Sequence, residues 1–204
     1  MKTPTKETTP TKPSDVVKTT AGSPASSGES DIHDNPGYMA PDQVDRMLMD
    51  VTSEKLHGEI SENLGVKYLS RVASAEHQVA PLFGQLYGLN GRLMVNVETR
   101  RMSRRGSEIQ YPRFNVIFLC DTAAPNTYLC EETLNAMLGN PENIPSSMHV
   151  HLANFPAVEA HLSPATGHYA DVNVIGMDLM SRIQTTIYGA DREFKLDLMS
   201  HRTH

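Results

Sequence analysis

The 204-residue sequence has little cysteine, no tryptophan, no long apolar run and no excess of basic charge. Only Cys120 and Cys130 are present, which excludes a disulfide framework and a Cys-x-x-Cys metal motif and favours a reducing compartment. No stretch approaches the ~20 apolar residues that span a bilayer, and no apolar segment follows the N-terminal lysines as in a secretory signal. The net charge of -6 disfavours nucleic-acid binding, which requires a basic surface. We therefore expect an intracellular, cytoplasmic protein without membrane or nucleic-acid partners.

The N-terminal segment lacks the residues that build a core. Residues 1–30 contain sixteen Ser, Thr or Pro residues and no Leu, Ile, Phe or Tyr. Such a segment buries too little apolar area to offset the entropy lost on ordering. The composition predicts a disordered tail over residues 1–41.

A different pattern begins at Asp42. Apolar residues recur at helical spacing, at Val44, Leu48, Val51, Leu56, Ile60, Leu64, Tyr68 and Val72. Gly58 and Gly65 are expected to divide the segment into short helices. The sequence predicts a helical segment over residues 42–87, which serves either for docking or dimerisation or simply packs on the following domain.

After Gly88, apolar residues recur at every second position instead of at helical spacing. Alternating or continuous apolar runs occupy residues 93–97, 114–120, 148–152, 158–162, 172–175, 183–187 and 194–198. One helical insert is expected at Glu131–Leu138. Short strands with one helix predict a mostly β domain over residues 88–204.

An apolar strand runs directly into Asp121 in the segment FLCDTAAPNTYL, residues 118–129. Burial at the end of such a strand raises the pKa of a carboxyl group, a cost that proteins tolerate where the carboxyl is hydrogen-bonded or catalytic. Thr122 offers a hydroxyl that can fix the loop, and the small Ala123 and Ala124 allow close backbone approach. These residues alone favour an aspartate that opens a turn.

A second segment, VNVIGMDLM at residues 172–180, changes this interpretation. An Asp-Thr-small-Ala loop after an apolar strand, followed 55 residues later by apolar-apolar-Gly-x-Asp, resembles the retropepsin family of aspartic proteases. This family comprises the retroviral and retrotransposon enzymes and their cellular relatives. The segment IQTTIYGADREFKLDL is similar to the terminal hairpin of retrotransposon proteases. The resemblance covers about Gly88 to Leu198 and implies a retropepsin-like acid-protease half-barrel that forms a homodimer.

The resemblance also implies roles for individual residues. Each of two chains would supply one catalytic carboxylate, Asp121, because the sequence has no second loop of this type. Two adjacent carboxyls share one proton, so one activates water and the other acts as acid. Thr122 would hold the two loops together, with Val174, Ile175 and Gly176 as the strand and turn behind them. The implied partners are a second copy and a peptide or polyprotein substrate, with no cofactor.

Two departures from the family pattern favour a second hypothesis. Ala123 stands where the family usually has Gly, and its methyl group restricts the backbone and the approach of substrate. If residues 148–162 form a core hairpin, only residues 139–147 remain for the flap that closes over the substrate, although 148–162 could instead be that flap. With a short flap, residues 42–89 are a candidate replacement. The alternative is therefore a weak or inactive dimerisation or peptide-binding module.

Three other groups of residues contain side chains with possible chemical roles. His149 and His151 share one strand face with His161 opposite, which suggests zinc binding or, more simply, solvated histidines. Arg100–Ser107 is expected to form a basic turn, which could contact nucleic acid or acidic peptide, carry a phosphate on Ser103 or Ser107, or be a solvated loop. Cys120 is expected to be a small core residue and not a nucleophile.

Overall fold

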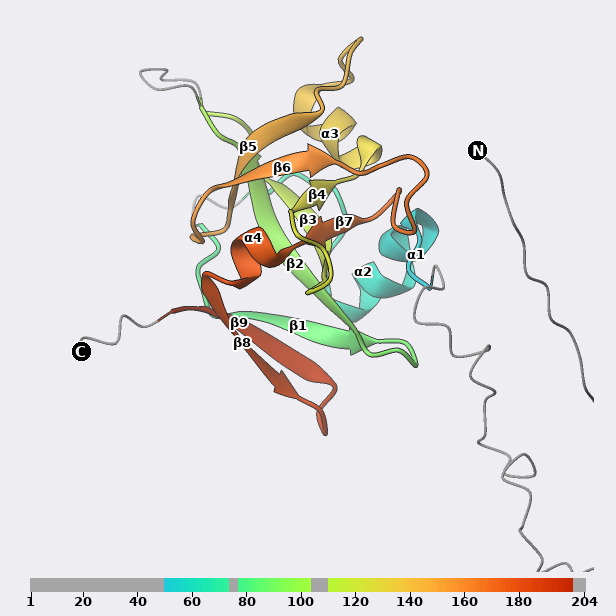
Figure 1. Ribbon diagram of the computed structural model, residues 1–204, viewed down its shortest axis with the longest axis vertical. Helices are drawn as coiled ribbons and strands as arrows, with labels where there is room; N and C mark the ends of the chain where they lie inside the picture. The colour runs from blue at the N-terminus through green and yellow to red at the C-terminus, as the bar shows by residue number, and fades with distance from the viewer. Residues whose placement is uncertain (1–49, 74–76, 104–109, 200–204) are drawn as a thin grey trace, which may run out of the picture. The chain divides into compact units, whose positions relative to one another are not determined.

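Strands make up most of the regular structure (Figure 1). The computed structural model describes residues 50–73, 77–103 and 110–199, all within the unit Pro41–His204. The helices are α1 (Ser53–His57), α2 (Glu59–Asn63), α3 (Glu131–Leu138) and α4 (Met177–Met180). The strands are β1 (Leu82–Tyr87), β2 (Arg92–Arg101), β3 (Phe114–Cys120), β4 (Tyr128–Leu129), β5 (Ser147–Leu152), β6 (Val158–Leu162), β7 (Asn173–Ile175), β8 (Ile183–Tyr188) and β9 (Glu193–Leu198). The prediction of a mostly β chain is confirmed.

Six strands close into a ring, in the order β2, β3, β7, β4, β6, β5 and back to β2. Closure removes the exposed edges that an open sheet would have. β3 is buried along almost its whole length, as its continuous apolar sequence predicts. The described residues thus form a closed ring of six strands, and the retropepsin-like half-barrel stays a prediction.

Three further strands extend the sheet away from the ring. β1 pairs with β2 and with β9, and β9 pairs in turn with β8. The β8–β9 hairpin lies at the bottom of the view in Figure 1, away from α3 and β5. This hairpin occupies the segment that the sequence suggested for it.

The predicted helical segment 42–87 is helical only over Ser53–Asn63 within the described residues. Gly58 and Gly65 end the two short helices, and Gly65 takes the left-handed φ of 64° that a helix end favours. The expected helix over Tyr68–Val72 is wrong. Leu69 and Val72 instead donate backbone hydrogen bonds to Asn115 and Arg113, because pairing with the start of β3 replaces helical bonds. Residues 42–49 of this segment and the predicted tail over residues 1–41 lie outside the described residues.

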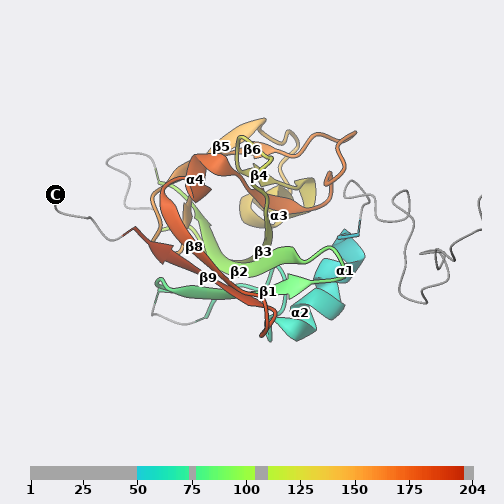
Figure 2. The ribbon, with the colours of Figure 1, turned by 60° about the horizontal axis from the view of Figure 1, so that its bottom comes forward.

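β1 lies within residues 42–87, and it pairs with β2 and β9 of the sheet. The helices pack on the strands nearby (Figure 2). Gln85 of β1 donates a side-chain hydrogen bond to the Asn63 carbonyl, and Tyr87 bonds to Glu59 of α2. The helical and β segments are therefore parts of one packed unit. Within the described ranges, no helix is long and apolar enough to cross a membrane.

Part of the predicted basic turn is strand. Arg100 and Arg101 close β2 and pair with β5, and Arg101 lies over the Tyr111 ring at 5.0 Å. Residues 104–109 lie outside the described part of the chain. The two described arginines are therefore held in the sheet and do not form a solvated loop.

Candidate active site at the Asp121 loop

The Asp121 loop connects β3 with β4 at one end of the ring. β3 runs parallel to β7, with Cys120 opposite Ile175. One residue beyond this pair, the Asp121 N–H donates to the Ile175 carbonyl at 3.0 Å. The structure thus places Val174 and Ile175 beside the strand that carries Asp121, although the two segments are far apart in sequence.

Asp121 itself opens a turn. Its Oδ1 accepts a hydrogen bond from the Ala123 N–H at 2.8 Å, and its carbonyl accepts one from Ala124 at 3.2 Å. The residue is half-buried. Among residues 50–73, 77–103 and 110–199, the Ala123 N–H is the one hydrogen-bond partner of this carboxylate. One carboxylate oxygen is thus fixed by the loop and the other has no partner in the described chain.

Gly176 lets the turn after β7 pack against the Asp121 loop. A Cβ at this position would lie 2.2 Å from the Asn126 carbonyl oxygen and 2.8 Å from that of Ala124. The Met177 N–H donates to the Ala124 carbonyl at 2.8 Å, and this bond joins the turn to the loop. Because backbone atoms fill the space of a side chain, only glycine fits here without a shift of the loop.

Thr127 and Asp178 form a second tie that sequence reasoning missed. The buried Thr127 hydroxyl donates to Asp178 Oδ1 at 2.8 Å and accepts a long bond of 3.4 Å from the Gly176 N–H. Asp178 belongs to the Gly-x-Asp motif, but no spacing rule marks Thr127 as its partner. The pair fixes the far side of the loop relative to α4.

Thr122 and Ala123 are the exposed tip of the loop. The Thr122 side chain has no hydrogen-bond partner in the described part of the chain. Ala123 is not among the described residues with positive φ, so its backbone does not need the conformational freedom of glycine. Ala123 is therefore accommodated in this loop without backbone strain.

Cys120, which precedes Asp121 in the chain, has surroundings that disfavour ionisation of its thiol. Burial raises the pKa of the Cys120 thiol to about 12, and the negative charge of Asp121 adds to the increase. A thiol of this kind stays protonated at neutral pH and is not a nucleophile. This agrees with the expected role of Cys120 as a core residue.

A charged pair and a tyrosine also lie near the loop. Arg92 precedes Leu93, which pairs with Cys120, so Arg92 lies at the same end of the sheet as Asp121. Its guanidinium bonds to Asp50 at 2.9 Å and lies 5.7 Å from the Tyr169 ring centroid. Burial raises the pKa of Tyr169; Arg92 lowers it, and the carboxylates of Asp50 and Asp121 raise it further. The surroundings of the loop thus contain both signs of charge.

No separate flap hairpin is present among residues 110–199. The one hairpin between α3 and β7 is β5–β6, and both of its strands belong to the ring through pairs with β2 and β4. Residues 139–146 contain no strand. The expectation that residues 148–162 form a core hairpin is confirmed, and residues 139–147 do not form a hairpin over the loop.

The histidines of β5 and β6 do not form a metal site in the described residues, where no cluster of three or more His, Cys, Asp or Glu side chains could hold an ion. In the strand register His149 is opposite Glu159, and His161 is opposite Ser147. Glu159 instead accepts a hydrogen bond from the Ser147 hydroxyl at 2.6 Å. The three histidines are separate strand residues with exposed or half-buried side chains.

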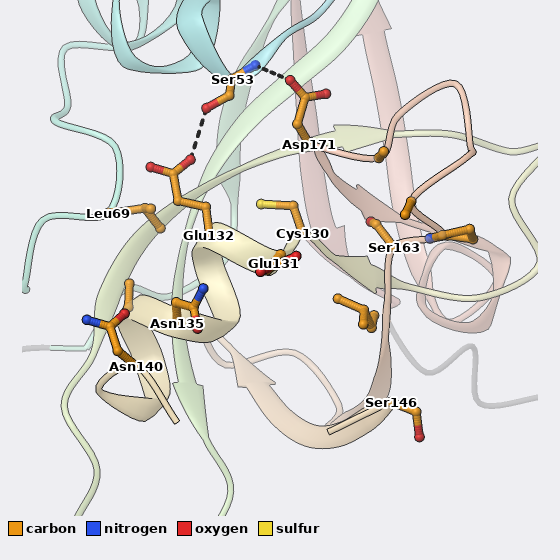
Figure 3. Close-up of a pocket in the computed structure, with 15 residues that line it drawn as sticks. Ser53, Leu69, Cys130, Glu131, Glu132, Asn135, Asn140, Ser146, Ser163 and Asp171 are labelled. Atoms are coloured by element: carbon orange, nitrogen blue, oxygen red, sulfur yellow. Dashed lines mark hydrogen bonds between the residues drawn. The ribbon is translucent and has the colours of Figure 1, made fainter. Parts of the chain in front are cut away.

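A cavity lies elsewhere, between α3 and the loop after β6 (Figure 3). Its volume is about 930 Å³, and none of the predicted site residues lines it. Ser53 bonds to two of its carboxylates, Asp171 through the backbone N–H at 2.8 Å and Glu132 through Oγ at 2.9 Å. These acidic groups already have partners within the chain.

A buried polar network holds the opposite end of β7. Asn173 accepts a hydrogen bond from the Cys130 N–H at 3.0 Å and donates to the Tyr68 hydroxyl at 2.8 Å and the Ile117 carbonyl at 3.2 Å. The Tyr68 hydroxyl also bonds to Thr133 at 2.9 Å. The network joins the N-terminal segment, α3 and the ring. An Asn within an apolar run was the signal in the sequence that could have found it.

Comparison with known proteins assigns no family to this arrangement. No protein-family model matches the chain, and no curated protein matches it significantly.

Proposed function

We propose that the chain is a retropepsin-like aspartic endopeptidase that acts as a homodimer, with one Asp121 from each subunit. Its substrate is a peptide or polyprotein segment bound in extended conformation, as expected for recognition by pairing with strands. A retrotransposon polyprotein or a cellular descendant is the expected origin.

One observation carries the proposal: the two motif segments, 55 residues apart, are bonded into one unit. The Asp121 N–H donates to Ile175, and the Met177 N–H donates to Ala124. Gly176 is packed too closely against the loop to be replaced by a larger residue. This is the relation between catalytic loop and supporting turn that the family resemblance implies.

The half-satisfied carboxylate of Asp121 supports a catalytic role. Ala123 fixes one oxygen, and the other has no partner in the described chain. When two such loops meet at a two-fold axis, their carboxylates share one proton because both cannot ionise at short distance. The ionised carboxylate takes a proton from water as the water attacks the peptide carbonyl carbon. The protonated carboxyl group stabilises the carbonyl oxygen, and a proton is then delivered to the leaving amine.

A second candidate function is an inactive dimerisation or peptide-binding module. It is favoured by one observation, the membership of β5 and β6 in the ring, which leaves no separate hairpin there to close over the substrate. Loss of a lid admits water and reduces the rate. Cleavage assays separate this candidate from an active enzyme.

The test compares cleavage of a mixed peptide library between about pH 4 and pH 7 by the wild type and by Asp121→Asn, because a dyad that shares one proton works in this range. Asparagine keeps the acceptor for the Ala123 N–H but removes the acid–base group. We expect cleavage to fall at least about 1000-fold, since the entire dyad chemistry is lost. Asp191→Asn, which changes the same charge in the β8–β9 turn, is the matched control and should cleave normally.

Equal cleavage by wild type and Asp121→Asn would contradict the proposal. A folded wild-type dimer that cuts no peptide but binds peptides would support the inactive module instead.

A further inference from the structure

The arginine near the end of β2 differs from other arginines of the sheet in having no anionic partner. Arg92 bonds to the Asp50 carboxylate at 2.9 Å. Arg113 bonds to the Glu98 carboxylate at 2.8 Å. The guanidinium of Arg100, in contrast, makes no hydrogen bond or ion pair within the described ranges. Its charge is therefore available to an anion from outside the described chain.

A small cavity lies at the end of β2, beside β5. It is lined by Arg100, Arg101, Met102, Ser103, Gln110, Tyr111 and His151. All of these side chains except Met102 can donate a hydrogen bond, and none of the described lining residues is acidic. The volume is about 190 Å³. This is below the roughly 300–1,000 Å³ of pockets for drug-sized ligands, so the cavity suits one small anionic group.

The strand register places two basic side chains opposite each other at this cavity. Arg100 of β2 is the cross-strand partner of His151 of β5. Like charges at directly opposite positions destabilise a sheet. Burial lowers the pKa of His151, and the charge of Arg100 lowers it further. A negative group bound between the two side chains would remove this repulsion.

Arg101 adds a second guanidinium whose position is restricted. It lies 5.0 Å from the centroid of the Tyr111 ring. Contact with an aromatic face orders the side chain before a ligand arrives, so less entropy is lost on binding. The planar fork of a guanidinium matches two oxygens of a phosphate group, which accepts both hydrogen bonds at once. Phosphate is therefore the small anion that these donors fit best.

We propose that this cavity binds a phosphate group, either inorganic phosphate or a phosphate monoester, through the guanidinium groups of Arg100 and Arg101. The Tyr111 hydroxyl and the His151 imidazole are available as further donors.

The phosphate site is separate from the Asp121 loop. Leu93, near the start of β2, pairs with Cys120 beside that loop. Arg100 lies near the other end of the same strand, roughly 23 Å away along it at a rise of about 3.3 Å per residue. Binding of phosphate therefore requires neither the dyad nor peptide cleavage.

The experiment follows the imidazole resonances of His151 by NMR in the full chain as inorganic phosphate is added. Ionic strength is held constant with sodium chloride, because added salt by itself screens exposed charges. We expect the resonances to shift and reach saturation. The thermal unfolding midpoint should rise in parallel, since a ligand that binds only the folded chain stabilises it. His151→Gln assigns the resonances.

Arg100→Gln should raise the dissociation constant for phosphate about tenfold or more, because charge-assisted hydrogen bonds are lost. Without phosphate this variant should be no less stable than the wild type, since the repulsion at His151 is also removed, which distinguishes lost binding from failure to fold. Arg100→Lys keeps the charge without the planar fork and should lose part of the affinity. Lys67→Gln is the matched control: it removes the same charge at an exposed position outside the cavity and should bind phosphate normally.

A second titration, with O-phosphoserine, distinguishes the two sources of the phosphate group. Tighter binding of phosphoserine than of inorganic phosphate identifies a monoester as the ligand, and the reverse identifies the free ion. His151 resonances that move with neither ligand would overturn the inference, as would an Arg100→Gln chain that binds phosphate as tightly as the wild type. Asp121→Asn should bind phosphate normally, so the phosphate site and the protease proposal can fail separately.

Discussion

The polar groups at the two ends of β7 differ in whether they have hydrogen-bond partners. At the N-terminal end, the amide of Asn173 is fully buried and bonded to Cys130, Ile117 and Tyr68. At the C-terminal end, β7 supports a loop tip where Thr122 and one oxygen of Asp121 have no hydrogen-bond partner among the described residues.

This difference distinguishes polar groups that contribute to stability from polar groups that are free to bind another molecule. A buried polar group without a partner costs free energy, so a fully satisfied network such as that of Asn173 contributes to stability. Polar groups that are exposed at the tip of a rigid loop contribute little to stability and are available to a second chain or a substrate. Mutations at the two ends should therefore separate stability from association.

The largest effect on stability is expected from Asn173→Ala. The substitution leaves the Cys130 N–H without a partner inside the core, so we expect a loss of about 3 kcal/mol in the free energy of unfolding. Urea denaturation measures this loss. Asn135→Ala on α3 removes an amide that makes no side-chain hydrogen bond in the described residues and should change stability little. Similar small losses for both variants would contradict the structural role of the network.

Gly176→Ala should have an intermediate effect. Its Cβ would lie 2.2 Å from the Asn126 carbonyl oxygen, so the loop must move, at an expected cost of about 2 kcal/mol. Peptide cleavage should fall with it, because Asp121 moves with the loop. In the matched control, Gly189→Ala, the new Cβ would have no neighbour within 4 Å. If Gly176→Ala is as stable and as active as Gly189→Ala, the close packing behind the loop is not required.

The smallest effect on stability is expected from Thr122→Val, within about 0.5 kcal/mol, because the hydroxyl is exposed and makes no bond in the described chain. The dimer should nevertheless weaken about tenfold, since two hydroxyls are lost at the axis. Thermal unfolding and sedimentation measure the two effects. Thr127→Val gives the contrast, because it removes the buried bond to Asp178 and should reduce stability more. A Thr122→Val dimer as tight as the wild type would remove Thr122 from the interface.

Much of the fold could be predicted from the sequence where local and long-range signals agree. β3 and α3 have the predicted bounds, Phe114–Cys120 and Glu131–Leu138, because a continuous apolar run and a helical pattern ending at Gly139 leave few alternatives. The prediction of a helix after Asn63 is wrong. The apolar spacing there fits a helix, but the backbone hydrogen-bonds to the start of β3 instead. Periodicity does not reveal such a competing partner.

Part of the candidate site could also be predicted from the sequence. Asp121 and Gly176 stand out because each follows an apolar run and belongs to a motif. Thr127 and Asn173 act through partners that are distant in sequence, at Asp178 and Tyr68. A single sequence gives no signal for such pairs, so they emerge only from the folded structure.

A dyad shared by two chains is tested most directly by the binding stoichiometry of a statine-type inhibitor. Isothermal titration at pH 5 should give one inhibitor molecule per two wild-type chains, and Asp121→Asn should bind it far more weakly. One inhibitor molecule per chain, or equal binding by Asp121→Asn, would contradict a dyad formed from two copies of Asp121.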